Sequence, residues 1–347
     1  MSSKLTIDGS FGEGGGQVLR SSLALSLITE KPFEIHHIRA NRKKPGLMPQ
    51  HLTAVNAAVA IGKADISGNA ISSTRISFAP TSIHPGNYHF NIGTAGSCTL
   101  VLQAILPALI LADKPSTITL EGGTHNPFAP PYDFMKKAFL PLICKMGPDI
   151  SMNLIRSGFY PAGGGIIEIN IRPSKQLKPI SLIDRGEILE KKAIAMVAHL
   201  PQSIAKRELK TIAQQLQLLD DQLQIQQITN SKGPGNVVSL LIRSENCSEV
   251  FTAFGKKGVR AEKVASNVSR ATLSYVSSSA AVGKHLADQL LIFMAMAGGG
   301  QFTTLPLTQH TLTNIEIIKQ FIDVDFNVQQ PSDQSLLHTI TILNNSQ

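Results

Sequence analysis

Three stretches of the chain repeat one order of apolar and polar segments. Each contains an apolar run of about three to four helical turns, then a break, a short strand, a second helix and two more strand-like runs. The apolar runs begin near Gln17, Leu100 and His285, and the breaks fall at Lys31-Pro32, Lys114-Pro115 and Gly298 to Gly300. We therefore predict three βαβαββ units at about residues 1–80, 87–173 and 281–345, with the first strand of the third near Pro179 to Ile183.

The segment between that strand and its helix has a pattern of its own. It predicts the order strand, helix, three strands and helix over residues 184–280, which is a small α/β domain. Insertion at the boundary of an element is the usual tolerated route. The predicted fold is thus α/β (α+β), with a large three-repeat domain of residues 1–183 plus 281–347 and an inserted smaller domain of residues 184–280.

One polar residue interrupts the first apolar helix of each unit at the equivalent position. These residues are Arg20, Gln103 and Asp288. If the units pack around a pseudo-threefold axis, the three side chains converge. The alternative is three independent surface residues, which the sequence leaves open.

Composition excludes several classes of protein. With 42% hydrophobic and 16% charged residues the chain is not largely disordered. The longest apolar run, Leu100 to Ala112, is interrupted by Gln103 and Pro107 and is too short to span a membrane. The first 16 residues carry no apolar segment of a signal peptide, so we expect a cytoplasmic location. Three widely separated cysteines predict free thiols rather than disulfides or a zinc cage.

The charge balance favours polyanionic partners. The formal net charge is +8 and the isoelectric point is about 9.4. Many basic proteins bind no nucleic acid, so charge alone does not decide the question. The absence of Trp and the four Tyr residues disfavour an aromatic platform for stacked bases.

Glycine-rich turns before two of the apolar helices suit a phosphate group. Gly12 to Gln17 follows a predicted strand and opens a helix, but Gln17 stands where a dinucleotide fingerprint has its last glycine. Glu13 within this turn is a candidate ligand of a phosphate-bridging metal ion, or only a favourable charge at a helix start. Residues 91–97, NIGTAGS, repeat the strand, turn and helix pattern.

Two further segments carry candidate chemistry. The loop that contains Arg39 and Arg42 holds four cations in six positions, which suits phosphate, although a solvated charge run explains it equally well. His310 precedes the second helix of the third unit and is a candidate nucleophile, general base or ligand. The alternative is an ordinary surface or core histidine.

Taken together, the motifs resemble the RNA 3'-terminal phosphate cyclases over nearly the whole chain. The resemblance is carried, in this order, by DGSFGEGGGQVLR, IRANRKKPGLMPQHL, GTAGSCTLVLQAILPAL, NPFAPPYDF, GFYPAGGG, HLADQL and TQHTLTN. It implies three βαβαββ repeats with an inserted domain of thioredoxin-like layout. It also implies an ATP-dependent reaction, in which a histidine becomes adenylylated and passes AMP to an RNA 3'-phosphate. The adjacent 2'-hydroxyl then closes a 2',3'-cyclic phosphate.

The resemblance also implies roles for individual residues. His310 matches the adenylylated histidine, Arg20 an arginine that contacts ATP or phosphate, and Glu13 a metal-binding acid. Arg39 and Arg42 match ligands of the substrate phosphate. The remaining positions that match the ATP site are Gln103, Pro131, Phe134, His285, Leu286, Ala287, Asp288 and Gln289.

The implied cofactors are ATP with Mg²⁺ or Mn²⁺, and the implied partner is an RNA with a 3'-phosphate end. No membrane partner is expected, and a homodimer is left open. The chain departs from the family pattern at His285, where a tyrosine commonly stacks on adenine, and at Ser157, which is often basic.

Other classes of protein compete with this interpretation. A noncatalytic cyclase-like branch works in ribosome assembly but lacks the histidine that His310 matches. The enolpyruvyl transferases share the repeat architecture but are larger and have two lobes of repeats. A plain RNA-binding module would need neither the glycine turns nor the three aligned polar positions.

Overall fold

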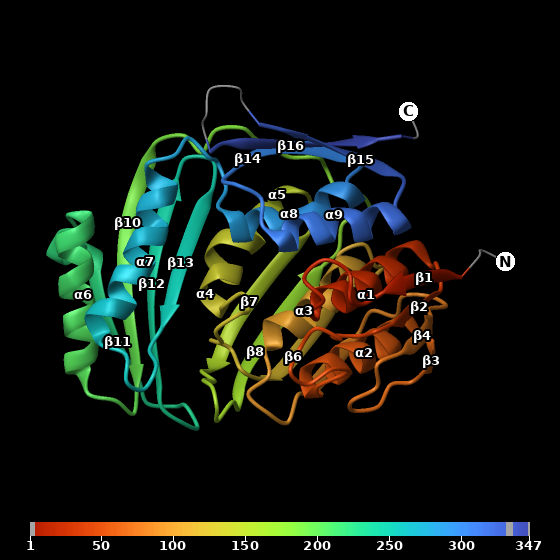
Figure 1. Ribbon diagram of the computed structural model, residues 1–347, viewed down its shortest axis with the longest axis horizontal. Helices are drawn as coiled ribbons and strands as arrows, with labels where there is room; N and C mark the ends of the chain where they lie inside the picture. The colour runs from red at the N-terminus through yellow and green to blue at the C-terminus, as the bar shows by residue number, and fades with distance from the viewer. Residues whose placement is uncertain (1–3, 331–335, 346–347) are drawn as a thin grey trace.

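The computed structural model describes residues 4–330 and 336–345, which form a mixed α/β molecule with four four-stranded sheets (Figure 1). The predicted α/β class is confirmed. The strand orders are β1-β2-β4-β3, β5-β6-β8-β7, β9-β14-β16-β15 and β11-β10-β12-β13. In the first three sheets the first two strands run parallel and the other neighbours run antiparallel, so these sheets share one topology.

The first of these sheets is built from the N-terminal residues. Its elements are β1 (Leu5–Asp8), α1 (Gln17–Thr29), β2 (Phe33–His36), α2 (Pro49–Gly62), β3 (Asp65–Ser67) and β4 (Ile76–Ala79). The apolar run from Gln17 predicted α1. The helix begins directly after Gly16, which occupies the N-cap position. The chain leaves the helix at Glu30, which is left-handed (φ +54°) and is followed by Lys31-Pro32.

The second unit departs from its prediction in one element. Its elements are β5 (Asn87–Asn91), α3 (Cys98–Leu109), β6 (Ser116–Gly122), α4 (Tyr132–Phe134), η1 (Met135–Phe139), α5 (Leu140–Lys145), β7 (Asp149–Arg156) and β8 (Gly165–Arg172). The sequence predicted a helix from Tyr132, and residues 132–145 are helical throughout, but the middle of this helix is not α-helical. The middle of it, η1, is a π-helical turn that ends just before Pro141. Pro141 has no N–H to donate to the preceding turn, so regular α-helical bonding cannot pass through it.

The third unit is split along the sequence. Its elements are β9 (Ser181–Leu182), α8 (Lys284–Met296), β14 (Gly299–Thr304), α9 (Gln309–Phe321), β15 (Val324–Gln329) and β16 (His338–Asn344). β9 is only two residues long and pairs in parallel with β14, as Ser181 with Gln301 and Leu182 with Phe302. The strand expected near residues 179–183 is therefore present.

The helices of these units form the centre of the molecule. Helix α1 packs against α2, α3 and α9, and α8 packs against α9, while the sheets lie outside them (Figure 1). Nearly every residue of α1 from Gln17 to Leu27 is buried. A helix that is buried all round belongs to a core, so polar side chains on it need partners.

Residues 188–276 form the remaining sheet and two helices. The elements are β10 (Ile188–Ala198), α6 (Gln202–Leu216), η2 (Asp220–Gln222), β11 (Leu223–Ile228), β12 (Gly235–Ser244), β13 (Ser248–Phe254) and α7 (Ala261–Val276). Helices α6 and α7 pack on each other and on the sheet, around an apolar cluster of their own. The order of elements is the predicted one, and the residue limits of the two domains stay a prediction.

Within residues 4–330 and 336–345, no helix is long and apolar enough to cross a membrane.

Candidate active site

His310 lies in the first turn of α9 with its ring half exposed. Thr308 precedes the helix and its side chain accepts a hydrogen bond from the amide of Thr311, which fixes where the helix begins. The His310 side chain is 47% exposed. Its Nδ1 lies 2.7 Å from Gln17 Oε1, and its Nε2 lies 2.6 Å from Glu13 Oε2. Both ring nitrogens thus face residues of the glycine-rich turn and the start of α1.

The Gln17 amide connects this ring to the core. Its Nε2 donates to Asp288 Oδ1 over 2.8 Å. A carboxylate offers only acceptors, so the nitrogen of Gln17 must face Asp288 and the oxygen must face His310. His310 Nδ1 therefore carries a proton and donates to Gln17, and Nε2 is the nitrogen directed at Glu13. The proton on Nδ1 is assigned from the hydrogen-bond network.

Asp288 is buried and receives several hydrogen bonds. Asn314 Nδ2 donates to its backbone oxygen (3.2 Å) and to Oδ1 (3.4 Å), and Gln289 Nε2 donates to Oδ2 (3.1 Å). Burial raises the pKa of Asp288, while His310, Gln17 and Arg20 act in the opposite direction. Asn314, one turn after His310 on α9, thus ties this helix to α8.

The three aligned polar residues lie in one hydrogen-bonded chain. Arg20 Nε donates to Gln103 Oε1 over 3.1 Å, and Gln103 Nε2 donates to Gln289, the neighbour of Asp288. Helices α1, α3 and α8 therefore meet at these side chains. Removal of water lowers the pKa of Arg20 to about 10, with Asp288 and Glu13 acting against it. Arg20 stays cationic at neutral pH and offers its remaining N–H groups to an anion.

Glu13 lies between Arg42 and His310. It forms an ion pair with Arg42, and its Oε2, which faces His310, is buried and accepts no hydrogen bond from the described residues. The predicted metal ligand and one predicted phosphate ligand are thus paired with each other. Arg39 Nη1 instead donates to the backbone oxygen of Gly46 over 2.6 Å.

The backbone of the glycine turn is crowded by these side chains. A Cβ added to Gly16 would overlap His51 Nε2 and lie 2.8 Å from Arg20 Nη1, and one on Gly15 would lie 2.8 Å from Arg42 Nη2. His51 is buried, and burial together with Arg20 and Arg39 lowers its pKa to about 3. It is therefore neutral at pH 7. Glycine is required here because the cationic groups approach the backbone itself.

The other residues predicted for the ATP site differ in the solvent exposure of their side chains. His285 is exposed in the first turn of α8, whereas Leu286 and Ala287 are buried in the main core. Pro131 precedes α4 and is buried, and Phe134 is 4% exposed within the same core. Phe134 can thus support the wall of a base site but offers a base little surface.

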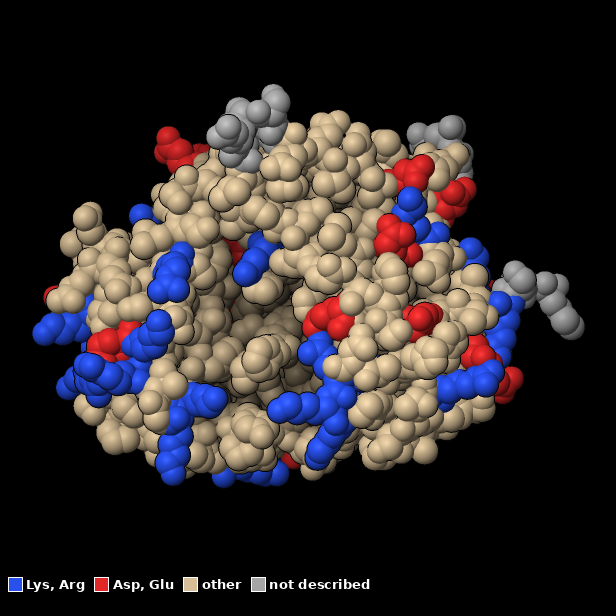
Figure 2. Space-filling view, in the orientation of Figure 1, with Lys and Arg blue, Asp and Glu red and all other residues tan. Residues whose placement is uncertain are grey.

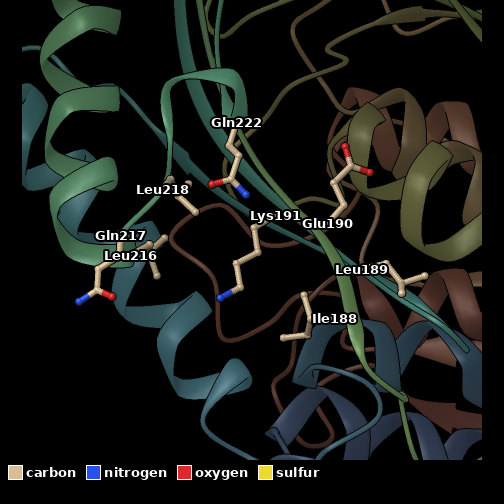
Figure 3. Close-up of a pocket in the computed structure, with 8 residues that line it drawn as sticks. All are labelled: Ile188, Leu189, Glu190, Lys191, Leu216, Gln217, Leu218 and Gln222. Carbon is tan, nitrogen blue, oxygen red and sulfur yellow. The ribbon is translucent and has the colours of Figure 1, made fainter.

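Basic side chains and two cavities lie outside the hydrogen-bonded network around His310. Figure 2 shows a hollow between the β13 side and the α3 side of the molecule, with Lys and Arg side chains along both margins. A cavity of about 200 Å³ is lined by Asn91, Thr94, Glu121 and Lys232, and Lys232 Nζ lies 3.3 Å from Glu121 Oε1. A second cavity, of about 330 Å³, is lined only by residues 188–191, 216–218 and 222 (Figure 3). It includes no residue of the His310 network.

Three residues of the site had no role in the sequence analysis. Gln17 was noted only as the residue in place of a glycine, Asn314 only as part of the segment around His310, and His51 was overlooked. The signal for Gln17 and Asn314 was available, since each is an amide residue on an otherwise buried helix face. For His51 nothing in the sequence indicated that its ring would reach Gly16.

Comparison with known proteins places nearly the whole chain in one group. A family model described as RNA 3'-terminal phosphate cyclase matches residues 11–328. The chain is 52% identical over 326 residues to a protein of Koribacter versatilis named RNA 3'-terminal phosphate cyclase, covering 94% of this chain and 92% of the relative. A protein of the same name from Ectopseudomonas mendocina is 46% identical over 332 residues, covering 96% of both chains.

Proposed function

The chain belongs to the RNA 3'-terminal phosphate cyclase family, and from this premise we propose that it converts the 3'-phosphate of RNA to a 2',3'-cyclic phosphate at the expense of ATP. The observation that carries the proposal is His310. Its ring is half exposed, and its Nδ1 is hydrogen-bonded to Gln17. Its Nε2 faces Glu13, which is paired with Arg42. The residue roles that follow are part of the proposal.

The proposed first step is attack of His310 Nε2 on the α-phosphorus of ATP. A nitrogen–phosphorus bond forms, the bond from the α-phosphorus to the bridging oxygen breaks, and pyrophosphate leaves with the electron pair. Nε2 is the attacking atom because Gln17 keeps the proton on Nδ1. In the free protein the nearby Glu13 carboxylate must move aside, or bind a cation, before a phosphate can approach.

The second and third steps use the RNA. An oxygen of the 3'-phosphate attacks the AMP phosphorus, the bond to Nε2 breaks, and the RNA end becomes a pyrophosphate linked to adenosine. The 2'-hydroxyl then attacks the RNA phosphorus, loses its proton, and AMP leaves. Ring closure is favoured because attacking and reacting atoms belong to one ribose. DNA lacks that hydroxyl, so only RNA can close the ring.

Three arginines are proposed to bind phosphate groups: Arg20, Arg39 and Arg42. Arg20 lies at the junction of α1 and α3 and stays charged despite its burial. Arg42 is exposed and already faces an anion, the Glu13 carboxylate, which a phosphate can replace. Fixed cations at these points stabilise the charge that develops on the transferred phosphorus.

The residues from His285 to Gln289 are proposed to hold the nucleoside with Gln103. His285 offers an exposed ring that can stack on adenine, with less area than a tyrosine. Pro131 and Phe134 are proposed to form the opposite wall. Leu286 and Ala287 are buried, so they position the backbone of α8 rather than contact a ligand with their side chains.

Glu13 fits a divalent cation, Mg²⁺ or Mn²⁺. Its Oε2 is a buried carboxylate oxygen without a hydrogen-bond donor, and one carboxylate with phosphate oxygens is a common set of Mg²⁺ ligands. When bound, such an ion neutralises phosphate charge. A cytoplasmic location and a homodimer remain predictions from the sequence.

The alternative is a noncatalytic cyclase-like protein that binds RNA in ribosome assembly. The presence of His310, and the network that fixes its tautomer, favour the enzyme. The test is an RNA with a ³²P-labelled 3'-phosphate, incubated with ATP and Mg²⁺ or Mn²⁺ and then treated with phosphatase.

The parent protein should make the label resistant to phosphatase, and His310→Asn should leave it sensitive. His338→Asn is the matched control, because His338 lies outside the network and its Nδ1 is 3.3 Å from the backbone oxygen of Leu336. A parent protein that binds the RNA but never protects the label would favour the noncatalytic function.

A further inference from the structure

A second group of metal-ligating side chains lies where β1 and β2 end. Asp8 is the last residue of β1, His36 is the last residue of the parallel strand β2, and His37 follows it. Within the described ranges 4–330 and 336–345 this is the one group of three His, Cys, Asp or Glu residues whose ligand atoms all lie within 4.8 Å of one another. Nothing in the sequence indicated this group, because Asp8 lies 28 positions before His36.

Two of the three separations between the ligand atoms match a small coordination sphere, and the third is within 4.8 Å. His36 Nδ1 and His37 Nδ1 are 3.1 Å apart, and His37 Nδ1 and Asp8 Oδ1 are 3.3 Å apart. With metal–ligand bonds of about 2.0–2.1 Å, two ligands of a tetrahedral Zn²⁺ ion are about 3.3 Å apart. We propose that Asp8 Oδ1, His36 Nδ1 and His37 Nδ1 bind one divalent transition-metal ion of the Zn²⁺ class, with water in the remaining position.

The backbone holds these ligands in place. The amide of Gly9 donates to the oxygen of His36 over 2.7 Å, which joins the two strand ends. His37 adopts a left-handed conformation (φ +55°), so its ring turns back towards Asp8. Asp8 Oδ1 accepts from the amide (2.9 Å) and hydroxyl (2.7 Å) of Ser10. These bonds, with His37, lower the pKa of Asp8, so the carboxylate is ionised at neutral pH.

A cation also resolves a conflict between the two rings. Two Nδ1 atoms at 3.1 Å require that one carries a proton and the other does not, and a metal ion can replace that proton and bind both lone pairs. The donor set of two imidazoles and one carboxylate suits Zn²⁺ and other first-row ions better than Mg²⁺ or Ca²⁺. The side chains of His37 and Asp8 are 65% and 50% exposed, so an ion can enter from solvent.

The position of this group gives it a structural consequence. Ser10 leads from Asp8 into the turn with Glu13, and Ile38 leads from His37 to Arg39. A bound ion would therefore fasten the starts of the two loops that carry the proposed phosphate ligands. Among the described residues, the hydrogen bonds of these three side chains go to Ser10 and to one another, and not to Glu13, Arg42 or His310.

The test is a titration of the metal-free full-length protein with Co²⁺, monitored by visible absorption, followed by displacement with Zn²⁺. We expect one equivalent of Co²⁺ to give the intense band of a four-coordinate ion, and Zn²⁺ to abolish it. The double variant His36→Asn, His37→Asn should lose the band. Asparagine is chosen because it tolerates the left-handed conformation at position 37. Zn²⁺ should raise the Tm of the parent protein but not that of the double variant.

Further variants keep the result decisive. Asp8→Asn retains an acceptor for Ser10 but loses the charge, and should weaken Co²⁺ binding at least about tenfold, since even the loss of a residue behind the ligands costs ~10–100-fold. His89→Asn removes an exposed histidine from another sheet and should change nothing. An unchanged band in the double variant, or loss of the band in His310→Asn with the triad intact, would overturn the proposal. Neither outcome bears on the cyclase reaction.

Discussion

At the scale of single residues, Gln17 decides which nitrogen of His310 is free to react. Its amide nitrogen is held by Asp288 and its oxygen by the ring, so a rotation of the amide would lose both hydrogen bonds. Asp288 thus orients the ring of His310 only through the Gln17 amide. The same residue also accepts a hydrogen bond from Asn314, which joins α8 to α9.

Gln17→Met is expected to lower the rate of adenylylation roughly 10–100-fold while KM for ATP changes little, because an isosteric side chain without polar atoms no longer fixes the ring. The measurement is single-turnover labelling by ATP at several ATP concentrations, which separates the rate from KM. The loss should appear in the labelling step itself, because the ring is then no longer held with Nε2 towards the ATP phosphate. Ser22→Ala is the control on the same helix, since its hydroxyl bonds Val18 and not the site. Equal losses in both variants would indicate a structural role only.

Glu249 gives a prediction for stability at the same scale. Burial raises its pKa to about 8, although the backbone amides of Gly283 and Val250 act against this. An unfolded glutamate ionises near pH 4.5, so the contribution of Glu249 to stability is complete below that pH and is lost as pH rises towards 8.

Glu249→Gln cannot ionise, so its Tm relative to the parent should rise by several degrees between pH 5 and pH 8, since 1 kcal/mol moves Tm by roughly 2–4 °C in domains of 150–250 residues. Thermal unfolding followed by circular dichroism checks this. Glu262→Gln is the matched control. Its hydrogen bond with Arg207 lowers the pKa of Glu262 to about 2, so it does not titrate in this window. A constant difference between Glu249→Gln and the parent would contradict the prediction.

At the scale of elements, the starts of the central helices were predictable and the side-chain network was not. Gly16 and Ser97 mark starts that glycine and capping rules identify. Pro141 indicated an irregularity in the helix that starts at Tyr132, but no local pattern showed that the irregularity would be a π-helical turn over Met135–Phe139, which packs against β13 and α8. Gln17 and Asp288 are 271 positions apart, and no local pattern predicts which rotamers bring them together.

Gly16→Ala tests the close approach of side chains to the glycine turn. Gly16 has an ordinary φ of −79°, so alanine costs no backbone strain, but its methyl group would displace His51 and Arg20. We expect at least a tenfold loss of ATP-dependent adenylylation with the fold intact, measured by labelling and circular dichroism. Gly86→Ala is the control, because its Cβ would meet only Tyr88 at 3.8 Å. Full activity of Gly16→Ala would show that adenylylation does not depend on the position of the Arg20 side chain.

At the scale of the whole molecule, three sheets of one topology place three helices around a common polar junction. The alignment of Arg20, Gln103 and Asp288 indicated this junction from the sequence because equivalent positions in repeated units become neighbours when the units pack around an axis. The partners of Glu13 were not predictable. Its pairing with Arg42 and His310 depends on loop conformations that join residues far apart in the chain.

The net charge of +8 makes a prediction at this scale. If the protein binds RNA through three or four phosphates, log K should fall against log salt with a slope of about −2 to −3, as expected for single strands. Fluorescence anisotropy with a 3'-phosphorylated oligonucleotide at several salt concentrations measures it. An affinity independent of salt would show that the basic surface does not contact the RNA.

The most direct test of the central claim is labelling of the protein by [α-³²P]ATP with Mg²⁺ or Mn²⁺ in the absence of RNA, followed by a denaturing gel and peptide mapping. We predict a label that is lost in acid and stable in base, as expected of a phosphoramidate, on the peptide that contains His310. His310→Asn should take up no label. A folded protein that remains unlabelled, or a label on another residue, would contradict the assignment of His310 as the nucleophile.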